Sequence, residues 1–337
     1  MTRQTFSALV STGMFVPSNE VPNAALRERY PEFVDKVEAP SGITTRFHAA
    51  DDEATSDLAA KAGRAALEAA GLDARDVDLV IVGTDTPDHL TPSTSVIVQH
   101  RLGAERAGTF DVGCACASFP TALATASGLI ATNPSIRNVL VIGAYLMHRL
   151  ADPDDPMFFF YGDGAGAAVV RASDQQGLVA SAFRANGAHA HQWLIQSGGT
   201  REPATHASID AGRTKVRMVE KYPREINEEG WPMLFRTVCD RAGWKVDEVD
   251  LGIFTQVRRS QIMRVAEGLG LGADRTHCIM QKWGYTGSAC IPMALHDALA
   301  EGRLSVGDKV VLVGSGVGYN QSAVALRVTE DLVGARP

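Results

Sequence analysis

The chain lacks the features that mark a secreted or membrane protein. Its first ten residues carry no long apolar segment of a signal peptide, and we see no apolar run as long as a membrane span. The five cysteines are an odd number without the spacing of a disulfide framework, which predicts reduced thiols and a cytoplasmic protein. No C-x-x-C pair and no second Cys/His pair at zinc spacing occurs, so we expect no metal site.

An excess of positive charge is also absent. The formal net charge of −7 argues against nucleic acid as the main partner, because phosphate binding needs a basic face. A local basic patch remains, and Arg258, Arg259 and Arg264 are the residues that would form it. The 337 residues exceed the size at which a single core usually keeps growing, so we expect two domains or two fused halves. Apolar residues make up 45% of the chain, which is ample for a large core.

Short apolar strands alternate with alanine-rich helical segments along the chain. Strands are predicted at 77–83, 138–143 and 309–314, and a helix is predicted at 57–70. This alternation is typical of an α/β protein with largely parallel sheets.

Two passages of the first half return in the second half at one offset. Residues 76–81 are echoed at 248–253 and residues 117–123 at 289–295, each 172 positions later. We interpret this as a duplicated α/β unit with halves 1–172 and 173–337, in which Ser288 is the counterpart of Cys116. Ordinary strand and helix starts without duplication are the alternative. Residues 185–227 are irregular and predict a lid or pocket wall.

Cys116 is the candidate nucleophile. It precedes an apolar helical pattern, so the helix dipole and free backbone N–H groups are expected to lower its pKa and to hold an oxyanion. A thiolate that attacks a thioester forms another thioester of similar energy, which suits acyl relay. A small buried cysteine with no chemistry is the alternative, and Cys114 is expected to be only a packing residue.

Six passages resemble the β-ketoacyl-ACP synthase III branch of the thiolase superfamily, and they extend along nearly the whole chain. The resemblance implies a thiolase-like fold of two duplicated α/β halves in a layered αβαβα arrangement. It also implies a homodimer, and it identifies Cys116 as the acyl-carrying residue. The passages are Ser41–Arg46, Gly83–Ser93, Cys114–Phe119, Gly162–Ala167, Gly284–Ala289 and Gly314–Gly318.

Two positions depart from the decarboxylating members of that family. Thr255 stands where the family has its catalytic histidine, and Tyr285 stands where it has asparagine. Hydroxyl groups can donate to an oxyanion but supply no imidazole. The family also places the glycine-rich loop with Gly316, Val317 and Gly318 beside the nucleophile, where its amides would help to bind an oxyanion.

The donor and the pocket also depart from the family pattern. The Trp and Arg residues with which many members hold coenzyme A are missing, which favours an acyl carrier protein as donor. No cofactor is then expected beyond the phosphopantetheine that the carrier brings, and the Arg258, Arg259 and Arg264 patch would bind that carrier. Thr91 replaces a bulky pocket residue contributed by the dimer mate, and we expect Thr91, Phe119 and Phe160 to line a roomy acyl pocket.

A proton acceptor for the incoming group must come from elsewhere in the chain. His189 or His191, in the segment that borders the family's pocket, is the first candidate, and His148 is the second. The remaining histidines are expected to be structural or exposed; they are His48, His100, His206, His277 and His296, with His89 inside a matched passage.

In lacking both catalytic residues and in having a roomy pocket, the chain resembles the acyltransferase members of this family in secondary metabolism. The sequence therefore predicts transfer of an acyl group, of the aryl methylsalicylate or orsellinate type or another bulky starter. The group would pass from a carrier protein through Cys116 to a second carrier or a small acceptor. A condensing synthase with displaced catalytic groups and a non-catalytic synthase partner remain the alternatives.

Overall fold

Runs of branched apolar residues form the strands of two sheets. The computed structural model describes residues 5–335. The first sheet has the order β1-β7-β6-β4-β5. Its strands are β1 (Phe6–Phe15), β4 (Leu79–Gly83), β5 (Gly108–Val112), β6 (Asn138–Tyr145) and β7 (Gly164–Ser173).

The second sheet has the order β11-β12-β13-β8. Its strands are β8 (Leu178–Ala185), β11 (Leu251–Phe254), β12 (Lys309–Gly316) and β13 (Asn320–Arg327). The expectation of largely parallel sheets was wrong. Among the strand pairs of these two sheets within residues 5–335, β4–β5, β4–β6 and β11–β12 are parallel. The strands β7 and β13 run antiparallel to both of their neighbours.

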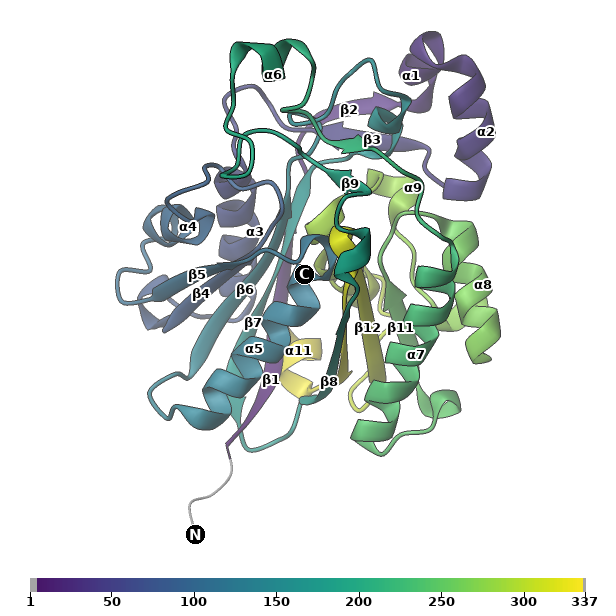
Figure 1. Ribbon diagram of the computed structural model, residues 1–337. Helices are drawn as coiled ribbons and strands as arrows, with labels where there is room; N and C mark the ends of the chain where they lie inside the picture. The colour runs from purple at the N-terminus through teal and green to yellow at the C-terminus, as the bar shows by residue number, and fades with distance from the viewer. Residues whose placement is uncertain (1–4, 336–337) are drawn as a thin grey trace.

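Helices and sheets stack in five alternating layers, as the thiolase-like expectation requires (Figure 1). Helices α3 (Thr55–Ala69) and α4 (Thr94–Leu102) cover the outer face of the first sheet. Helices α7 (Glu225–Ala242) and α8 (Arg259–Leu269) lie on the other outer face. The central layer is formed by α5 (Ser118–Thr132) and α10 (Cys290–Ala300), which contact both sheets.

One stretch, Ala115–Thr132, is long and apolar enough to span a membrane by length and composition, contrary to our reading of the sequence. Its position explains the composition. The helix α5 lies between the two sheets and touches strands of both, so its apolar side chains belong to the core.

The two halves repeat the same elements at the offset seen in the sequence. The strand β1 begins at Phe6 and β8 at Leu178, which is 172 positions later. Two short 3₁₀ turns, η2 (Ala115–Ala117) and η7 (Gly287–Ala289), have the same separation. We keep the division into 1–172 and 173–337 as a proposal, since the repeated elements favour it without fixing its boundary.

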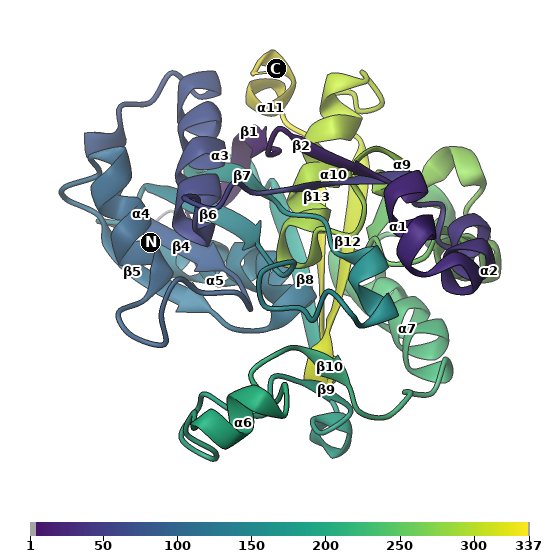
Figure 2. The same ribbon diagram turned by 90° about the horizontal axis from the view of Figure 1, so that it is seen from above.

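Two excursions project from the layered body (Figure 2). The first contains β2 (Asn19–Pro22), α1 (Asn23–Arg29), α2 (Pro31–Ser41) and β3 (Thr45–His48). The second connects β8 to α7 and contains η4 (Gly187–His189), β9 (Trp193–Leu194), α6 (His206–Asp210) and β10 (Arg217–Met218). It contacts η8 (Val317–Tyr319), so the irregular segment 185–227 forms a wall above that turn.

The remaining elements are short and connect the layers. They are η1 (Ala74–Asp76), η3 (Pro156–Phe160), η5 (Val246–Glu248), η6 (Ala273–Arg275), α9 (Met280–Trp283) and α11 (Glu330–Gly334).

Candidate active site

The Cys116 side chain lies in the turn η2, immediately before the central helix α5. The preceding Ala115 has φ 47°, a left-handed conformation that is uncommon for a residue with a side chain and marks a sharp turn. The residue Cys116 is 5% exposed. Its Sγ atom shares a hydrogen bond with the Tyr285 hydroxyl, so residues 169 positions apart in the chain meet at one sulfur atom.

The glycine-rich end of β12 packs directly against this turn. A Cβ atom at Gly314 would lie 2.8 Å from Ala117 Cα, and one at Gly316 would overlap the carbonyl oxygen of Cys114. Glycine is therefore needed at both positions for the backbones to approach. The loop expected to border the nucleophile does so, although its role in binding an oxyanion stays a prediction.

The thiol has a raised pKa, not the lowered one that the sequence suggested. Burial is the largest cause, and the nearby charge of Asp85 adds to it. The hydrogen bond from Tyr285 lowers the pKa only in part. The resting thiol is consequently protonated, and any reaction through Cys116 has to remove that proton.

A carboxyl group that we did not predict stands beside the turn. Asp85 follows β4 and is partly buried, and its Oδ1 accepts a hydrogen bond from Ser288 Oγ at 2.8 Å. The Ser288 hydroxyl also lies 3.0 Å from the carbonyl oxygen of Ala115. Burial raises the pKa of Asp85 to about 6. An acidic residue directly after a buried strand was the signal for Asp85 in the sequence.

Models of one protein family match both halves of the chain. The 3-oxoacyl-[acyl-carrier-protein (ACP)] synthase III model matches residues 110–187, and its C-terminal model matches residues 239–328. The β-ketoacyl-[acyl-carrier-protein] synthases III of Neisseria meningitidis and Neisseria gonorrhoeae are each 34% identical over 330 residues. That alignment covers 96% of this chain and 99% of theirs.

The chain belongs to the β-ketoacyl-ACP synthase III family. It is thus an enzyme of a family whose members transfer or condense acyl groups.

Solved structures support the same fold. The 3-oxoacyl-[acyl-carrier-protein] synthase III from Aquifex aeolicus is 30% identical, with a TM-score of 0.86 over 96% of this chain and all of that one. The priming β-ketosynthase of a polyketide biosynthetic pathway is 27% identical, with a TM-score of 0.89 over 98% of each chain. OleA from Xanthomonas campestris, at 22% identity and TM-score 0.81, shares the fold.

The two positions that depart from the family pattern differ in what they do here. The Tyr285 hydroxyl contacts the nucleophile, whereas Thr255 is 1% exposed and its oxygen accepts the Ser315 N–H at 2.8 Å. Both hydroxyls could donate to an oxyanion. Thr255 ties the start of the glycine-rich loop to the end of β11, and donation by its own O–H group to an oxyanion stays a prediction.

Neither histidine of the predicted pair reaches the thiol. His191 forms an ion pair with Glu220 at the surface, where its side chain is 64% exposed. His189 packs edge-on against Tyr319, which in turn packs against Tyr222. The expectation that one of them is the base is not supported by this geometry, because an imidazole must approach its proton to within hydrogen-bonding distance.

His148, the second candidate, belongs to a separate polar cluster. Its Nδ1 atom is hydrogen-bonded to the buried carboxylate of Asp163, and its ring stacks on His48 at 4.4 Å. Burial lowers the pKa of His48 to about 4, so this partner is neutral at physiological pH. The cluster holds the Asp163 side chain and makes no contact with Cys116 among the described residues.

The three expected pocket residues lie in different surroundings. Phe119 is buried in α5, three positions after the nucleophile. The Phe160 ring packs edge-on against Phe33, and its backbone oxygen accepts the Tyr285 N–H, so Phe160 positions that tyrosine. Thr91 is exposed in the single chain. Its contribution to the pocket of a second protomer stays a prediction.

The predicted basic patch divides into two parts. Arg264 pairs with Glu228 of α7 at 2.8 Å. Arg258 and Arg259 are exposed at the start of α8, and no acidic side chain within residues 5–335 pairs with either. The Arg258 guanidinium lies over the Phe160 ring at 5.6 Å. This part of the patch therefore adjoins the residue that positions Tyr285.

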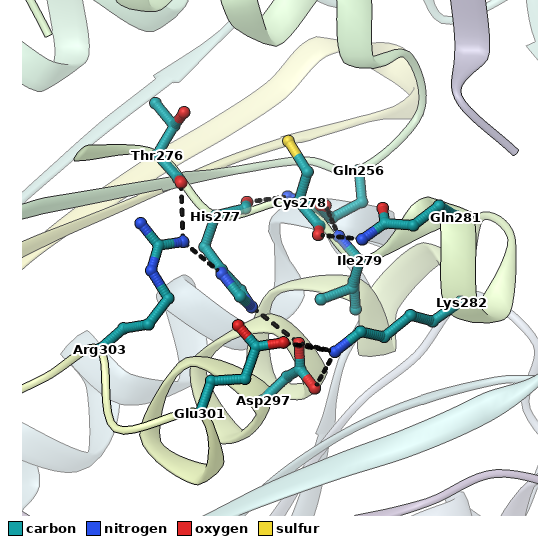
Figure 3. Close-up of polar contacts among 10 residues, drawn as sticks. All are labelled: Gln256, Thr276, His277, Cys278, Ile279, Gln281, Lys282, Asp297, Glu301 and Arg303. Atoms are coloured by element: carbon teal, nitrogen blue, oxygen red, sulfur yellow. Dashed lines mark hydrogen bonds and ion pairs between the residues drawn. The ribbon is translucent and has the colours of Figure 1, made fainter. Parts of the chain in front are cut away.

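One group of potential metal ligands lies away from this site (Figure 3). Side-chain atoms of His277, Asp297 and Glu301 come within 4.8 Å of one another. The Lys282 ammonium donates to both carboxylates, and the His277 ring is held between Arg303 and Asp297. A metal ion would have to displace these partners, so we assign the cluster to an ion-pair network that joins α9 to α10.

Proposed function

We propose that this family member is an acyltransferase. It takes an acyl group from an acyl carrier protein onto Cys116 and passes it to a second carrier or a small-molecule acceptor. An aryl group of the methylsalicylate or orsellinate type, or another bulky starter, is the proposed cargo. Phosphopantetheine arrives on the carrier, so the enzyme itself would need no cofactor.

The observation that carries this proposal is the Tyr285 hydroxyl at the Cys116 sulfur. A phenol donates to the sulfur or to the oxygen of an acyl intermediate, but it offers no imidazole to stabilise an enolate. No histidine among the described residues contacts Cys116. The buried turn and the glycine-rich loop are retained, and these are what thioester exchange requires.

Intact-protein mass spectrometry tests the first half of the reaction. Incubation with an aryl-acyl carrier protein should add the mass of the acyl group, and peptide mapping should place it on Cys116. Cys116→Ala should remove the adduct. Lack of an adduct with aryl, alkyl and acetyl donors would overturn the proposal.

A condensing activity is the second candidate, because the similar Neisseria proteins are named β-ketoacyl-[acyl-carrier-protein] synthases. Labelled carbon dioxide released from malonyl carrier protein after loading of Cys116 would identify it. A non-catalytic synthase partner is the third. It requires that Cys116→Ala leaves the output of the reconstituted pathway unchanged.

Assembly and location belong to the same proposal. We propose a homodimer, supported by the exposed loop that carries Thr91, in which the neighbouring Leu90 is 82% exposed. The mass measured by light scattering tests it. A cytoplasmic location is proposed from the five unpaired cysteines.

A further inference from the structure

The site described above contains a nucleophile without an obvious proton acceptor. The buried Cys116 thiol is protonated at rest because burial raises its pKa. None of the three predicted histidines contacts it among the described residues. Thioester exchange nevertheless moves one proton in each half-reaction, so a base is required within the site.

We propose that Asp85 is the general acid–base group of the acyl transfer, a proposal that rests on the function assigned to Cys116. Asp85 lies two positions after the end of β4, and hydrogen bonds through Ser288 connect it to the turn that holds the nucleophile. Its carboxylate is hydrogen-bonded to Ser288, and the Ser288 hydroxyl is also within hydrogen-bonding distance of the Ala115 carbonyl oxygen, next to the nucleophile. Ser288, the counterpart of Cys116 in the second half of the chain, is thereby the hydrogen-bond partner of Asp85 in the first half.

The hydrogen bonds around Ser288 suit both protonation states of the carboxyl group. A serine hydroxyl has one proton, and here it faces two acceptors, Asp85 Oδ1 and the Ala115 oxygen. When Asp85 is ionised, Ser288 donates to it, and the Ala115 oxygen keeps the N–H of Ser118. When Asp85 is protonated, it can donate to Ser288, which then donates to Ala115. The carboxyl group can therefore gain and lose a proton without leaving a polar group unpaired.

The other ionisable groups near Asp85 stay uncharged near neutral pH. Its charge acts on Cys116, Cys290, Tyr145 and Tyr161. Burial raises the pKa of each of these four, that of Cys290 to about 12. Asp85, with its pKa raised to about 6, is thus the group of this set that changes charge between pH 5 and 7, which is the range suited to a general base.

The steps balance without an oxidant or a cofactor. In loading, the S–H bond of Cys116 breaks and its proton goes to the Asp85 carboxylate while Sγ forms a bond to the acyl carbon. The carbon–sulfur bond of the donor then breaks, and the leaving thiolate takes the proton from Asp85. In transfer, the acceptor thiol or hydroxyl loses its proton to Asp85 while its sulfur or oxygen forms a bond to the acyl carbon. The bond between that carbon and Cys116 Sγ then breaks, and the Cys116 thiolate takes the proton from Asp85.

The experiment separates loading from transfer. Wild-type enzyme is acetylated with 4-nitrophenyl acetate, freed of excess ester, and mixed with N-acetylcysteamine. The loss of the acetyl group from Cys116 is followed by intact mass spectrometry between pH 4.5 and 8. Nitrophenolate leaves without a proton, but the Cys116 thiol still has to lose one, so variants that lack the acid–base group should load slowly. They are incubated with excess ester until intact mass shows complete acetylation, and only then is transfer measured.

For the wild type we expect the transfer rate to rise with an inflection near pH 6. Asp85→Asn should lower the rate at pH 7.5 by about 100-fold or more, the ordinary contribution of a general base, and should abolish that inflection. Ser288→Ala keeps the carboxyl group but removes a hydrogen bond that lowers its pKa, so the inflection should move above pH 6. Asp88→Asn, in the same loop, is the charge-matched control and should behave as the wild type.

The outcomes are distinguishable from failure of the proposed function. If wild-type Cys116 takes no acyl group from 4-nitrophenyl acetate or from the aryl, alkyl and acetyl donors used above, the acyl-transfer proposal itself is wrong. If it loads and Asp85→Asn transfers at the wild-type rate with the same inflection, Asp85 is not the base. A fall in rate for Asp85→Asn with no shift of the inflection in Ser288→Ala would also overturn the assignment, because it would indicate a purely structural role.

Discussion

At the scale of single residues, the chemistry of this site depends on how burial shifts the pKa values of its side chains. Burial raises the pKa of the thiol, the phenol and the carboxyl group, and each of these shifts favours the neutral form. The residues involved are Cys116, Tyr285 and Asp85. These three groups are therefore uncharged until the carboxyl group ionises, and within residues 5–335 no cationic side chain forms an ion pair with Asp85.

Removing the Tyr285 hydroxyl should make Cys116 less reactive. Tyr285→Phe deletes the hydrogen bond that lowers the thiol pKa, and such a bond contributes about 0.5–1.5 kcal/mol. Alkylation of Cys116 by iodoacetamide at pH 8 should slow by roughly three- to tenfold, measured by peptide mass spectrometry. The partly exposed Cys278 in the same sample is the internal control and should react as before. Equal or faster alkylation of Cys116 would contradict the role of the hydroxyl.

Neutralising Asp85 should stabilise the fold above pH 6. The native pKa of Asp85 is raised above its unfolded value, so the native state binds more protons between about pH 4 and 6, and stability falls as the pH rises through that window. Asp85→Asn should remove a penalty of about 3 kcal/mol at pH 8 and little at pH 3.5. Urea unfolding at both pH values measures it. A variant that is less stable at pH 8 would show that the carboxylate is a net stabilising group.

At the scale of elements, two backbones are brought into contact at the nucleophile. The turn η2 is bent by the left-handed Ala115, and the end of β12 fits against it only because Gly314 and Gly316 have no side chain. The sequence predicted a functional loop after a buried strand. It could not reveal which atoms that loop meets, because the contact joins residues about 200 positions apart.

Gly316→Ala should disturb the nucleophile turn. The added methyl group would overlap the Cys114 carbonyl oxygen, and overpacking of this kind costs about 1–3 kcal/mol. A lower melting temperature and loss of acetyl loading on Cys116 are expected. Gly113→Ala is the matched control, since a methyl group there meets nothing within 4 Å and its φ is not left-handed. Equal behaviour of the two variants would indicate that the close approach is unimportant.

At the scale of the whole molecule, the duplicated halves supply different parts of one site. The first half brings Cys116 and Asp85, and the second brings Ser288, Tyr285 and the glycine-rich loop. The exposed start of α8 then offers a basic surface next to this site. That surface suits an acidic carrier protein, which is the partner that the function proposed above requires.

The two unpaired arginines of α8 should affect carrier-bound donors selectively. Arg258→Ala and Arg259→Ala should each raise the KM for acyl carrier protein about three- to tenfold, and salt should reduce the difference because it screens exposed charges. Turnover of an N-acetylcysteamine thioester should stay unchanged. Arg264→Ala is the control, since Glu228 already pairs with that guanidinium. Equal effects of all three variants on both donors would contradict the assignment.

The sequence alone determined the repeat and the alternation of strands and helices, because such patterning is encoded over short distances. Its resemblance to a known family supplied the layered fold, the nucleophile Cys116 and the status of Tyr285 as a substituted catalytic position. Only the tertiary structure decided what surrounds the sulfur atom. It placed Tyr285 on Cys116, turned His191 to the surface, and brought Ser288 to Asp85 across 203 positions. It also reversed the expected shift of the thiol pKa, because desolvation depends on burial from all sides and outweighs the helix N-terminus.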